Sequence, residues 1–287
     1  MQHSFSRRRP ALSVLAGGIF ALGLFAASIA PAAAWKNGPP EHKVTTRPED
    51  CAHPPYSTHD WIADHARALL PARERAWLDP WRNLLLIGTE APDYRKITAV
   101  CGTPNRGYGD TGHGHHDLRF AADGSVTYDL PARRADEEYA KAVAAYRAGR
   151  PGDAAYFLGA VAHYIGDLSQ YGHTIKGEVH HHDYEEAVGA LTRSFDGGHV
   201  FEAYIRPRPL VTRRAYDAVV RTGRFTWEGR PPLLPPAEMD RRYTPGALVE
   251  PDFRASVGTA LNKAVNETAD VLHTFYEEVV RRRDGAR

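Results

Sequence analysis

The sequence predicts an all-α fold, a single multi-helix domain with one short β-hairpin. Three observations support this prediction. Apolar residues recur at helical spacing along most of the chain, one stretch alone alternates as strands do, and no internal repeat divides the sequence. A chain of 287 residues with 43% hydrophobic content can bury one large core. The formal net charge of +1 does not indicate a surface that binds polyanions.

The N-terminus has the composition of a signal peptide. Three consecutive arginines at residues 7–9 precede an uncharged Ala-, Gly- and Leu-rich stretch, and the alanines at 32–34 supply the small residues of a cleavage site. We therefore expect residues 1–34 to be removed and the domain to span residues 35–287, in a secreted or periplasmic protein. The apolar stretch is nearly long enough to cross a bilayer, so an uncleaved anchor is the alternative. The arginines also leave twin-arginine export open.

The two cysteines, Cys51 and Cys101, are interpreted through this predicted export. In an oxidising compartment they could close a disulfide. Their spacing fits no zinc motif, so their expected role is structural. Two free, buried thiols are the alternative.

The first half of the domain combines helices with irregular segments. Residues 36–57 are rich in proline and without period, which indicates an irregular segment. Helices are expected at 59–70 and 73–86, where apolar residues follow helical spacing. Residues 88–115 are dense in Gly, Pro, Asn and Asp and predict a long, functional loop. Alternation around Asp-Gly predicts a hairpin over 117–129.

Helices dominate the second half. The predicted helix over 132–148 ends before Gly149, a suitable C-terminal cap. Pro231–Pro236 predicts a stiff connection. Further helices are expected at 154–170, 184–193, 200–205 and 253–280.

The most informative motif lies within and after the helix expected at 154–170. Its residues are His163, Asp167, His173, His181 and Glu185, which read H-x3-D-x5-H-x7-H-x3-E. Helical residues four apart share a face, so the first two can reach one point, and so can the last two. Imidazole together with carboxylate is a ligand set that suits Zn²⁺. The string therefore predicts a zinc centre.

These residues lie in segments that resemble the bacterial zinc-dependent phospholipases C. Phe157–Asp167 is similar to the F-L-G-x-x-x-H-Y-x-G-D helix of that family, and His181–Glu185 is similar to its H-x-x-Y-E. His59–Ile62 resembles the family's first histidine with its Trp-Ile pair, and Ala91–Tyr94 resembles an A-x-D-Y segment. The family's fold is all-helical and holds a trinuclear zinc cleft, so the resemblance implies three zinc ions.

The resemblance also implies which residues bind each ion. One zinc would take Asp93, a histidine of the pair His115 and His116, His163 and Asp167. A second would take His173, His181 and Glu185, and the third would take the amino terminus of Trp35, His59 and Asp167. Of the histidine pair, His116 is preferred because it directly precedes the predicted hairpin, but His115 stays an alternative. His113, His180 and His182 are expected to neighbour the ligands without binding zinc, or to be exposed to solvent.

As an activity, the resemblance implies a secreted zinc-dependent phosphodiesterase that cleaves phospholipids at a membrane surface through a zinc-activated hydroxide. Asp93 is the expected catalytic base, or a ligand alone. Tyr94 matches a tyrosine of the family's headgroup pocket. His113 replaces a family aromatic residue, so the headgroup stays open.

Two other functions remain compatible with the sequence. The same superfamily includes single-strand-preferring zinc nucleases, which would bind nucleic acid through aromatic and basic groups. A non-catalytic periplasmic zinc-binding protein is the other alternative, suggested by the 15 histidines. No protein partner is evident from the sequence.

Overall fold

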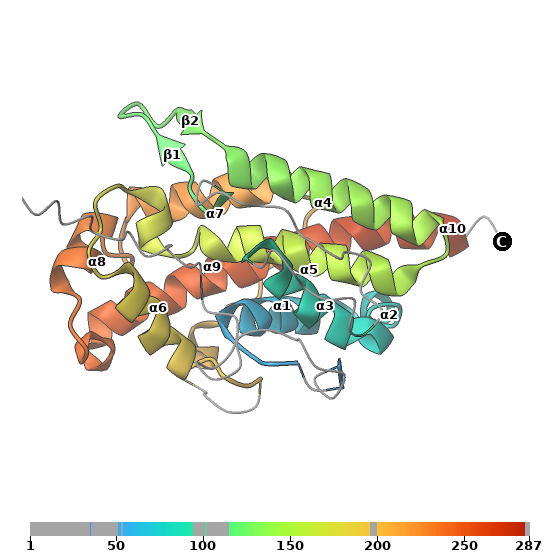
Figure 1. The fold of residues 1–287 in the computed structure, drawn as a ribbon, viewed down its shortest axis with the longest axis horizontal. Coiled ribbons are helices and arrows are strands. Elements are labelled where there is room, and N and C mark those ends of the chain that lie inside the picture. Colours follow the sequence, from blue (N-terminus) through green and yellow to red (C-terminus); the bar gives the residue numbers. More distant parts are fainter. Residues whose placement is uncertain are drawn as a thin grey trace, which may run out of the picture. The chain divides into compact units, whose positions relative to one another are not determined.

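The fold is all-α with one two-stranded antiparallel hairpin, as predicted (Figure 1). The computed structural model describes Trp35, Cys51, Ala52, residues 54–93, Cys101, residues 115–195 and residues 200–284. The predicted signal peptide, residues 1–34, and most of the predicted irregular segment, residues 36–57, lie outside this part. None of the described helices combines the length and the apolar character that a membrane crossing requires.

The N-terminal helices are shorter than the sequence predicts. Helix α1, Thr58–Ala68, matches the helix expected at 59–70, and the Asp60 carboxylate closes its first turn by accepting the Ser57 N–H at 2.9 Å. The single helix predicted for 73–86 is wrong. Pro80 has no N–H to continue a helix, and the segment divides there into shorter elements. These are α2, Ala72–Arg75, the 3₁₀ turn η2, Asp79–Trp81, and helix α3, Arg82–Glu90.

The loop predicted for 88–115 begins later than expected. Helix α3 continues to Glu90, and the 3₁₀ turn η3, Ala91–Asp93, follows it directly. Most of the remaining loop, including Tyr94 and His113, lies outside the described residues. The predicted hairpin forms, with strands β1, Arg119–Phe120, and β2, Val126–Tyr128.

The middle of the chain folds as two long helices and one shorter helix. Helix α4, Leu130–Arg147, is followed by Gly149, whose φ of +80° fits the left-handed cap that the sequence predicts. Helix α5, Pro151–Asp167, begins and ends three residues before its predicted bounds of 154 and 170. Helix α6, His181–Ala190, likewise begins and ends earlier than the predicted 184–193.

The C-terminal third contains two helices that the sequence analysis missed. Helix α7 buries only small side chains at helical spacing, among them Ala218, Thr222 and Gly223, so its buried face lacks the large apolar residues by which the other helices were predicted. The short helix α8 begins directly after the predicted connection, which ends at Pro236. The helix predicted at 200–205 is wrong, since only a 3₁₀ turn forms there. The elements of the C-terminal third are η7, Glu202–Tyr204, α7, Ala215–Glu228, α8, Pro236–Arg242, η8, Ala247–Val249, α9, Pro251–Phe275, a π turn, Tyr276–Val280, and α10, Arg281–Asp284.

Helix α5 lies at the centre of the domain. It packs against α1, α3, α4, α7 and α9, and Figure 1 shows α4 on one side of it and α9 on the other. All but three of its residues are buried. The side chains of α5 that face its neighbours are therefore held away from water on every side, including the polar ones at its C-terminal end.

Two glycines allow α3 and α5 to approach closely. A Cβ on Gly159 would overlap the Leu85 carbonyl oxygen and lie 2.8 Å from the Gly88 Cα. A Cβ on Gly88 would overlap the Tyr156 carbonyl oxygen in the same way. Because the two backbones touch here, the end of α3 and the residues after it lie beside the C-terminal half of α5.

Gly159→Ala is expected to destabilise the protein by about 1 to 3 kcal/mol, the usual cost of overpacking. The added methyl group would push α3 from α5, because both overlapping atoms belong to backbone. Denaturant unfolding measures the change. Gly189→Ala is the matched control, since a Cβ there meets only Thr58 Oγ1 at 3.9 Å. Equal stability of the two variants would contradict the close approach of the helices.

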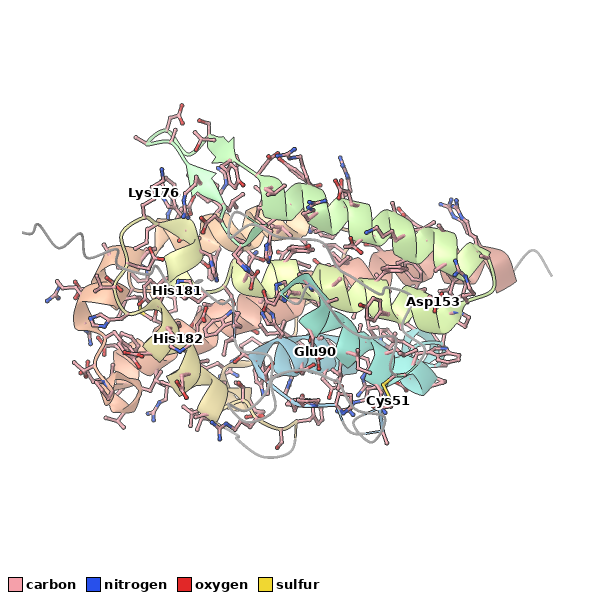
Figure 2. All side chains as sticks on the ribbon, in the orientation of Figure 1. Cys51, Glu90, Asp153, Lys176, His181 and His182 are labelled. Carbon is pink, nitrogen blue, oxygen red and sulfur yellow. A yellow bond between two sulfur atoms is a disulfide. The ribbon has the colours of Figure 1, made fainter. Side chains whose placement is uncertain are left out.

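A disulfide joins Cys51 to Cys101, with Cα atoms 5.4 Å apart, and Figure 2 labels Cys51 beside the yellow sulfur bond. The pairing decides between the two alternatives that the sequence left open. The bond closes a loop across a sequence separation of 50 residues, which in the chain-entropy model stabilises the fold by about 4 kcal/mol. The loop it closes contains α1 and α3, so it restrains both helices.

Candidate metal centre

The structure brings the nine predicted ligand residues into one region from segments far apart in the sequence. Helix α5 contributes two of them from its last turns, and α1 and η3 approach them from one side. The 3₁₀ turn η6, Tyr171–Thr174, and α6 contribute three more. Their positions are α1 for His59, η3 for Asp93, the segment before β1 for His116, α5 for His163 and Asp167, η6 for His173, α6 for His181 and Glu185, and the separate Trp35.

Asp167 lies between three imidazoles. Its Oδ1 is 3.3 Å from His59 Nε2, and its Oδ2 is 3.2 Å from His163 Nε2. The same Oδ2 is 2.8 Å from Nδ1 of His116. Because its two oxygens face different histidines, this carboxylate can serve two metal positions at once.

Asp93 lies at the centre of a second group. Its Oδ1 is 3.5 Å from Nε2 of His163, 3.4 Å from Nε2 of His116 and 3.6 Å from Nε2 of His115. Both histidines of the pair therefore reach the same carboxylate, and the choice between them stays open. His116 differs from His115 in that its other ring nitrogen contacts Asp167.

A third group combines η6 with the start of α6. Glu185 Oε1 lies 3.6 Å from His173 Nε2 and 2.8 Å from His181 Nε2. The last distance joins residues four apart on one helix, as the H-x3-E spacing predicts. His173 also stacks on His116, with ring centroids 5.3 Å apart, so this group adjoins the other two.

The polar atoms of these groups fit bound zinc. Buried atoms that make no hydrogen bond within the described part of the chain include both ring nitrogens of His59, His163 Nε2, Asp167 Oδ1 and His173 Nε2. An unpaired buried polar group costs about 1 to 3 kcal/mol. Two ligands of one tetrahedral zinc ion, each at about 2.0 to 2.1 Å, lie about 3.3 Å apart. The separations of 3.2 to 3.6 Å around Asp93 and Asp167 match that value.

The carboxylates are ionised and suited to bind cations. Burial raises the pKa of Asp167, but His163 and His116 more than offset it and hold the pKa well below its ordinary value. The pKa of Asp93 lies below its ordinary value for the same reason, with His163 the main opposing group. Glu185 behaves likewise beside His181.

In the metal-free protein the imidazole pKa is lowered at two of these histidines and raised at others. Burial lowers the pKa of His59, and it lowers that of His116 to about 4. Burial acts in the same direction on His163 and His181, but Asp167 raises the pKa of the former to about 9 and Glu185 raises that of the latter to about 10. A cation at either position must therefore displace a proton.

Residues that the sequence analysis did not single out support His163. Its Nδ1–H donates to the Thr89 carbonyl at 2.8 Å, which leaves Nε2 to face the carboxylates. The Thr89 hydroxyl in turn donates to Asp60 Oδ1 at 3.0 Å. Burial raises the pKa of Asp60 to about 7, although hydrogen bonds from Thr89 and Ser57 oppose the shift.

Other carboxylates and an amide support the third group. Glu178 Oε1 lies 3.2 Å from His181 Nδ1, and the Gln170 side chain donates to Glu185 Oε1 at 3.2 Å. Asp117 Oδ1 lies 3.8 Å from His173 Nδ1. Such partners orient metal-binding imidazoles, and for Gln170 and Asp117 no helical or strand spacing in the sequence could have identified them.

Trp35 is fully buried against the end of α5. Its indole Nε1 donates to the Gly166 carbonyl at 2.8 Å and to the Ser169 hydroxyl at 3.2 Å. The ring packs on Tyr184, with centroids 5.5 Å apart. The side chain therefore fixes Trp35 against Gly166, which directly precedes Asp167 in the sequence, and beside α6.

Three other described histidines, His180, His182 and His273, belong to none of these groups. His182 is exposed on α6, where Figure 2 labels it beside His181, and His180 is half-buried against the ring of Tyr243. Another cluster, formed by Glu74, His273 and Glu277, belongs to a different part of the domain. There His273 Nδ1 contacts Glu74 at 2.8 Å and Arg281 pairs with Glu277 at 2.6 Å, so these groups already satisfy one another.

Comparison with known proteins identifies a family and related folds. The chain matches the model of zinc dependent phospholipase C over residues 58–218, more than half of its length. Among solved structures, it is similar to the alpha toxin from Clostridium absonum with a TM-score of 0.51 and 14% identity. That match covers 78% of this chain and 64% of the toxin, so the likeness is one of fold. No curated protein matches the sequence. The family match confirms the resemblance found in the sequence, and the chain belongs to the zinc-dependent phospholipase C family.

Proposed function

We propose that the protein is a secreted phosphodiesterase that hydrolyses phospholipids in the manner of a phospholipase C and binds three zinc ions. The observation that carries the proposal is the set of buried imidazoles and carboxylates whose facing atoms stand at the spacing of shared zinc ligands, in a chain matched by the family model. Several of these atoms, on His59, His163 and His173, make no hydrogen bond within the described part of the chain. Asp93, His163, Asp167 and His115 or His116 would hold one ion. His173, His181 and Glu185 would hold another, and the Trp35 terminus, His59 and Asp167 the third.

The protein's own residues would bind the ions and orient water. Bound zinc supplies the Lewis acidity that lowers the pKa of water toward neutrality and offsets charge on the phosphate. Asp93 is the carboxylate of the centre with most access to water, since its side chain is 11% exposed whereas those of Asp167 and Glu185 are fully buried. We therefore assign Asp93 to accept the proton of the attacking water, in addition to its role as a ligand.

The proposal that the protein is exported rests on the sequence of residues 1–34, and the disulfide supports it. Disulfides persist in oxidising compartments and are rare in the cytosol. A covalent bond between Cys51 and Cys101 is therefore expected in a protein that leaves the cytosol.

The activity is tested with zinc-loaded protein on vesicles of phosphatidylcholine and, in parallel, on single-stranded DNA. Release of phosphocholine and diacylglycerol from the vesicles is the expected result. Cleavage of DNA alone would overturn the phospholipase proposal in favour of a zinc nuclease. Stable zinc binding without hydrolysis of either substrate would indicate a zinc-binding protein.

The length of the N-terminus provides a separate prediction. A chain that begins at Trp35 is expected to bind three zinc ions, because its free amino group completes the site with His59 and Asp167. A chain that keeps Ala34 before it should bind two and lose about 100-fold in activity, the upper end of what a lost supporting group costs. Elemental analysis measures the zinc content. The matched control carries an extra alanine after Arg287, and equal zinc in all three chains would contradict the proposed ligand.

A further inference from the structure

The carboxylate of Asp240 is the centre of a small hydrogen-bond network beside the metal centre. This residue lies on α8, which Figure 1 shows next to α6. Its Oδ1 accepts hydrogen bonds from the Tyr171 hydroxyl at 3.0 Å, the His180 N–H at 3.0 Å and the Val179 N–H at 3.1 Å. Its Oδ2 accepts a fourth hydrogen bond from the Val179 N–H at 3.2 Å. One side chain thus holds three groups of another segment.

The three groups flank two of the proposed zinc ligands. Tyr171 lies two residues before His173, and Val179 and His180 immediately precede His181. Asp240 therefore connects the chain just before one histidine to the chain just before the other. Both stretches of chain are thus held by one carboxylate.

The segment between the two histidines needs such a restraint. Residues 175–180 form no helix or strand, and Gly177 has a φ of +79°, in the left-handed region. Val179 is 76% exposed, so its side chain contributes little packing. The hydrogen bonds from its backbone N–H to Asp240 tie this residue to helix α8. By holding Val179, they also fix the preceding Glu178, which contacts His181 Nδ1.

We propose that Asp240 is a positioning residue for the zinc ion bound by His173, His181 and Glu185, an inference that rests on the proposed function. It contacts none of the ligand side chains, and acts by holding the backbone that carries two of them. Helix α8 lies beyond residues 58–218, where the chain matches the family model. The hydrogen bonds that Asp240 accepts are therefore a feature of this chain that the family match does not include.

A purely structural role makes a different prediction from a positioning role. A carboxylate beside the N-terminus of α6 also stabilises that helix, because it interacts with the helix dipole and with the N–H groups that the first turn leaves unpaired. That contribution is the same whether or not zinc is bound. A positioning residue, in contrast, matters mainly when the ligands must converge on the ion, so its loss should affect the zinc-loaded protein more than the metal-free one.

The experiment compares zinc affinity and thermal stability in three variants of the zinc-loaded protein. Asp240→Asn removes the charge and part of the network, and Tyr171→Phe removes one hydrogen bond while keeping the ring. Glu238→Gln is the matched control on the same helix, since its carboxylate pairs only with Arg241 in the described part of the chain. Bound zinc is measured by elemental analysis during titration with a competing chelator, and the melting temperature is measured with and without zinc.

For Asp240→Asn we expect one zinc ion to bind about 10- to 100-fold more weakly while the others keep wild-type affinity, the usual effect of losing a supporting group. Tyr171→Phe should change the same ion in the same direction but less, and Glu238→Gln should match wild type. The melting temperature of Asp240→Asn should fall more with zinc than without it. Wild-type affinity for every ion, or an equal fall in both states, would overturn this inference alone. A wild-type protein that retains no zinc would overturn it together with the proposed function.

Discussion

Asp167→Asn is expected to lower phospholipid hydrolysis more than any other single substitution, by at least about 1,000-fold. Loss of a group that merely supports a ligand already costs about 10- to 100-fold in metal affinity or activity. Asp167 is proposed to be a ligand itself, and to belong to two zinc positions. The substitution keeps the size of the side chain and removes its charge, so the loss can be attributed to metal binding.

The geometry explains why this residue should matter more than its neighbours. One oxygen faces His59 and the other faces His163 and His116, at 3.3, 3.2 and 2.8 Å. An amide presents a single acceptor, and its NH₂ group would point at one of these imidazoles. The variant is therefore expected to lose affinity for two zinc ions rather than one.

The measurement combines zinc content with the rate on phosphatidylcholine vesicles. Asp153→Asn is the matched control, because it removes a carboxylate from the other end of the same helix, where Asp153 pairs with Arg150 at 3.0 Å. Figure 2 labels Asp153 on α5, far from His181 on α6. Zinc content and rate near wild type in Asp167→Asn would refute the bridging role.

Helical periodicity predicted the parts of the centre that lie within one helix. Two pairs of residues four apart, His163 with Asp167 and His181 with Glu185, do meet, at 3.2 and 2.8 Å. Spacing could not predict which distant helix would bring His59 or Asp93 to them. Those two assignments came from the family resemblance, because packing between helices is not a local property of the sequence.

The features that the sequence did not predict likewise depend on packing or on contacts between distant segments. Helix α7 packs through Gly223, whose missing Cβ makes room for the side chains of Leu118 and Leu168, so small residues stand where large apolar side chains would have revealed the helix. Adjacent histidines in an irregular segment, His115 and His116, have no period to separate them. Asp240 lies on a seven-residue helix, and its role depends on a partner segment about 60 residues away in the sequence.

Removal of zinc is expected to abolish activity and to lower the melting temperature. With free zinc at 1,000 times the dissociation constant, each site stabilises the folded protein by about 4 kcal/mol. Chelation followed by dialysis should give an inactive, less stable protein, and added zinc should restore both properties. Added magnesium is the control, because a site of imidazoles and few carboxylates does not suit it. Full activity in protein shown to hold no zinc would exclude the proposed mechanism.

Zinc should also leave more readily as the pH falls. In the metal-free protein the pKa values of His163 and His181 are about 9 and about 10, so both imidazoles are protonated at neutral pH. Zinc binds the neutral imidazole, and below these pKa values each fall of one pH unit weakens zinc affinity about tenfold for each proton that must be displaced.

The raised pKa values stabilise the metal-free fold at acidic and neutral pH, and that contribution is lost as the pH rises through about 9 and about 10. The two effects act together, so a fixed chelator concentration should extract more zinc at pH 6 than at pH 8. Equal extraction at both values would show that neither imidazole releases a proton to the metal.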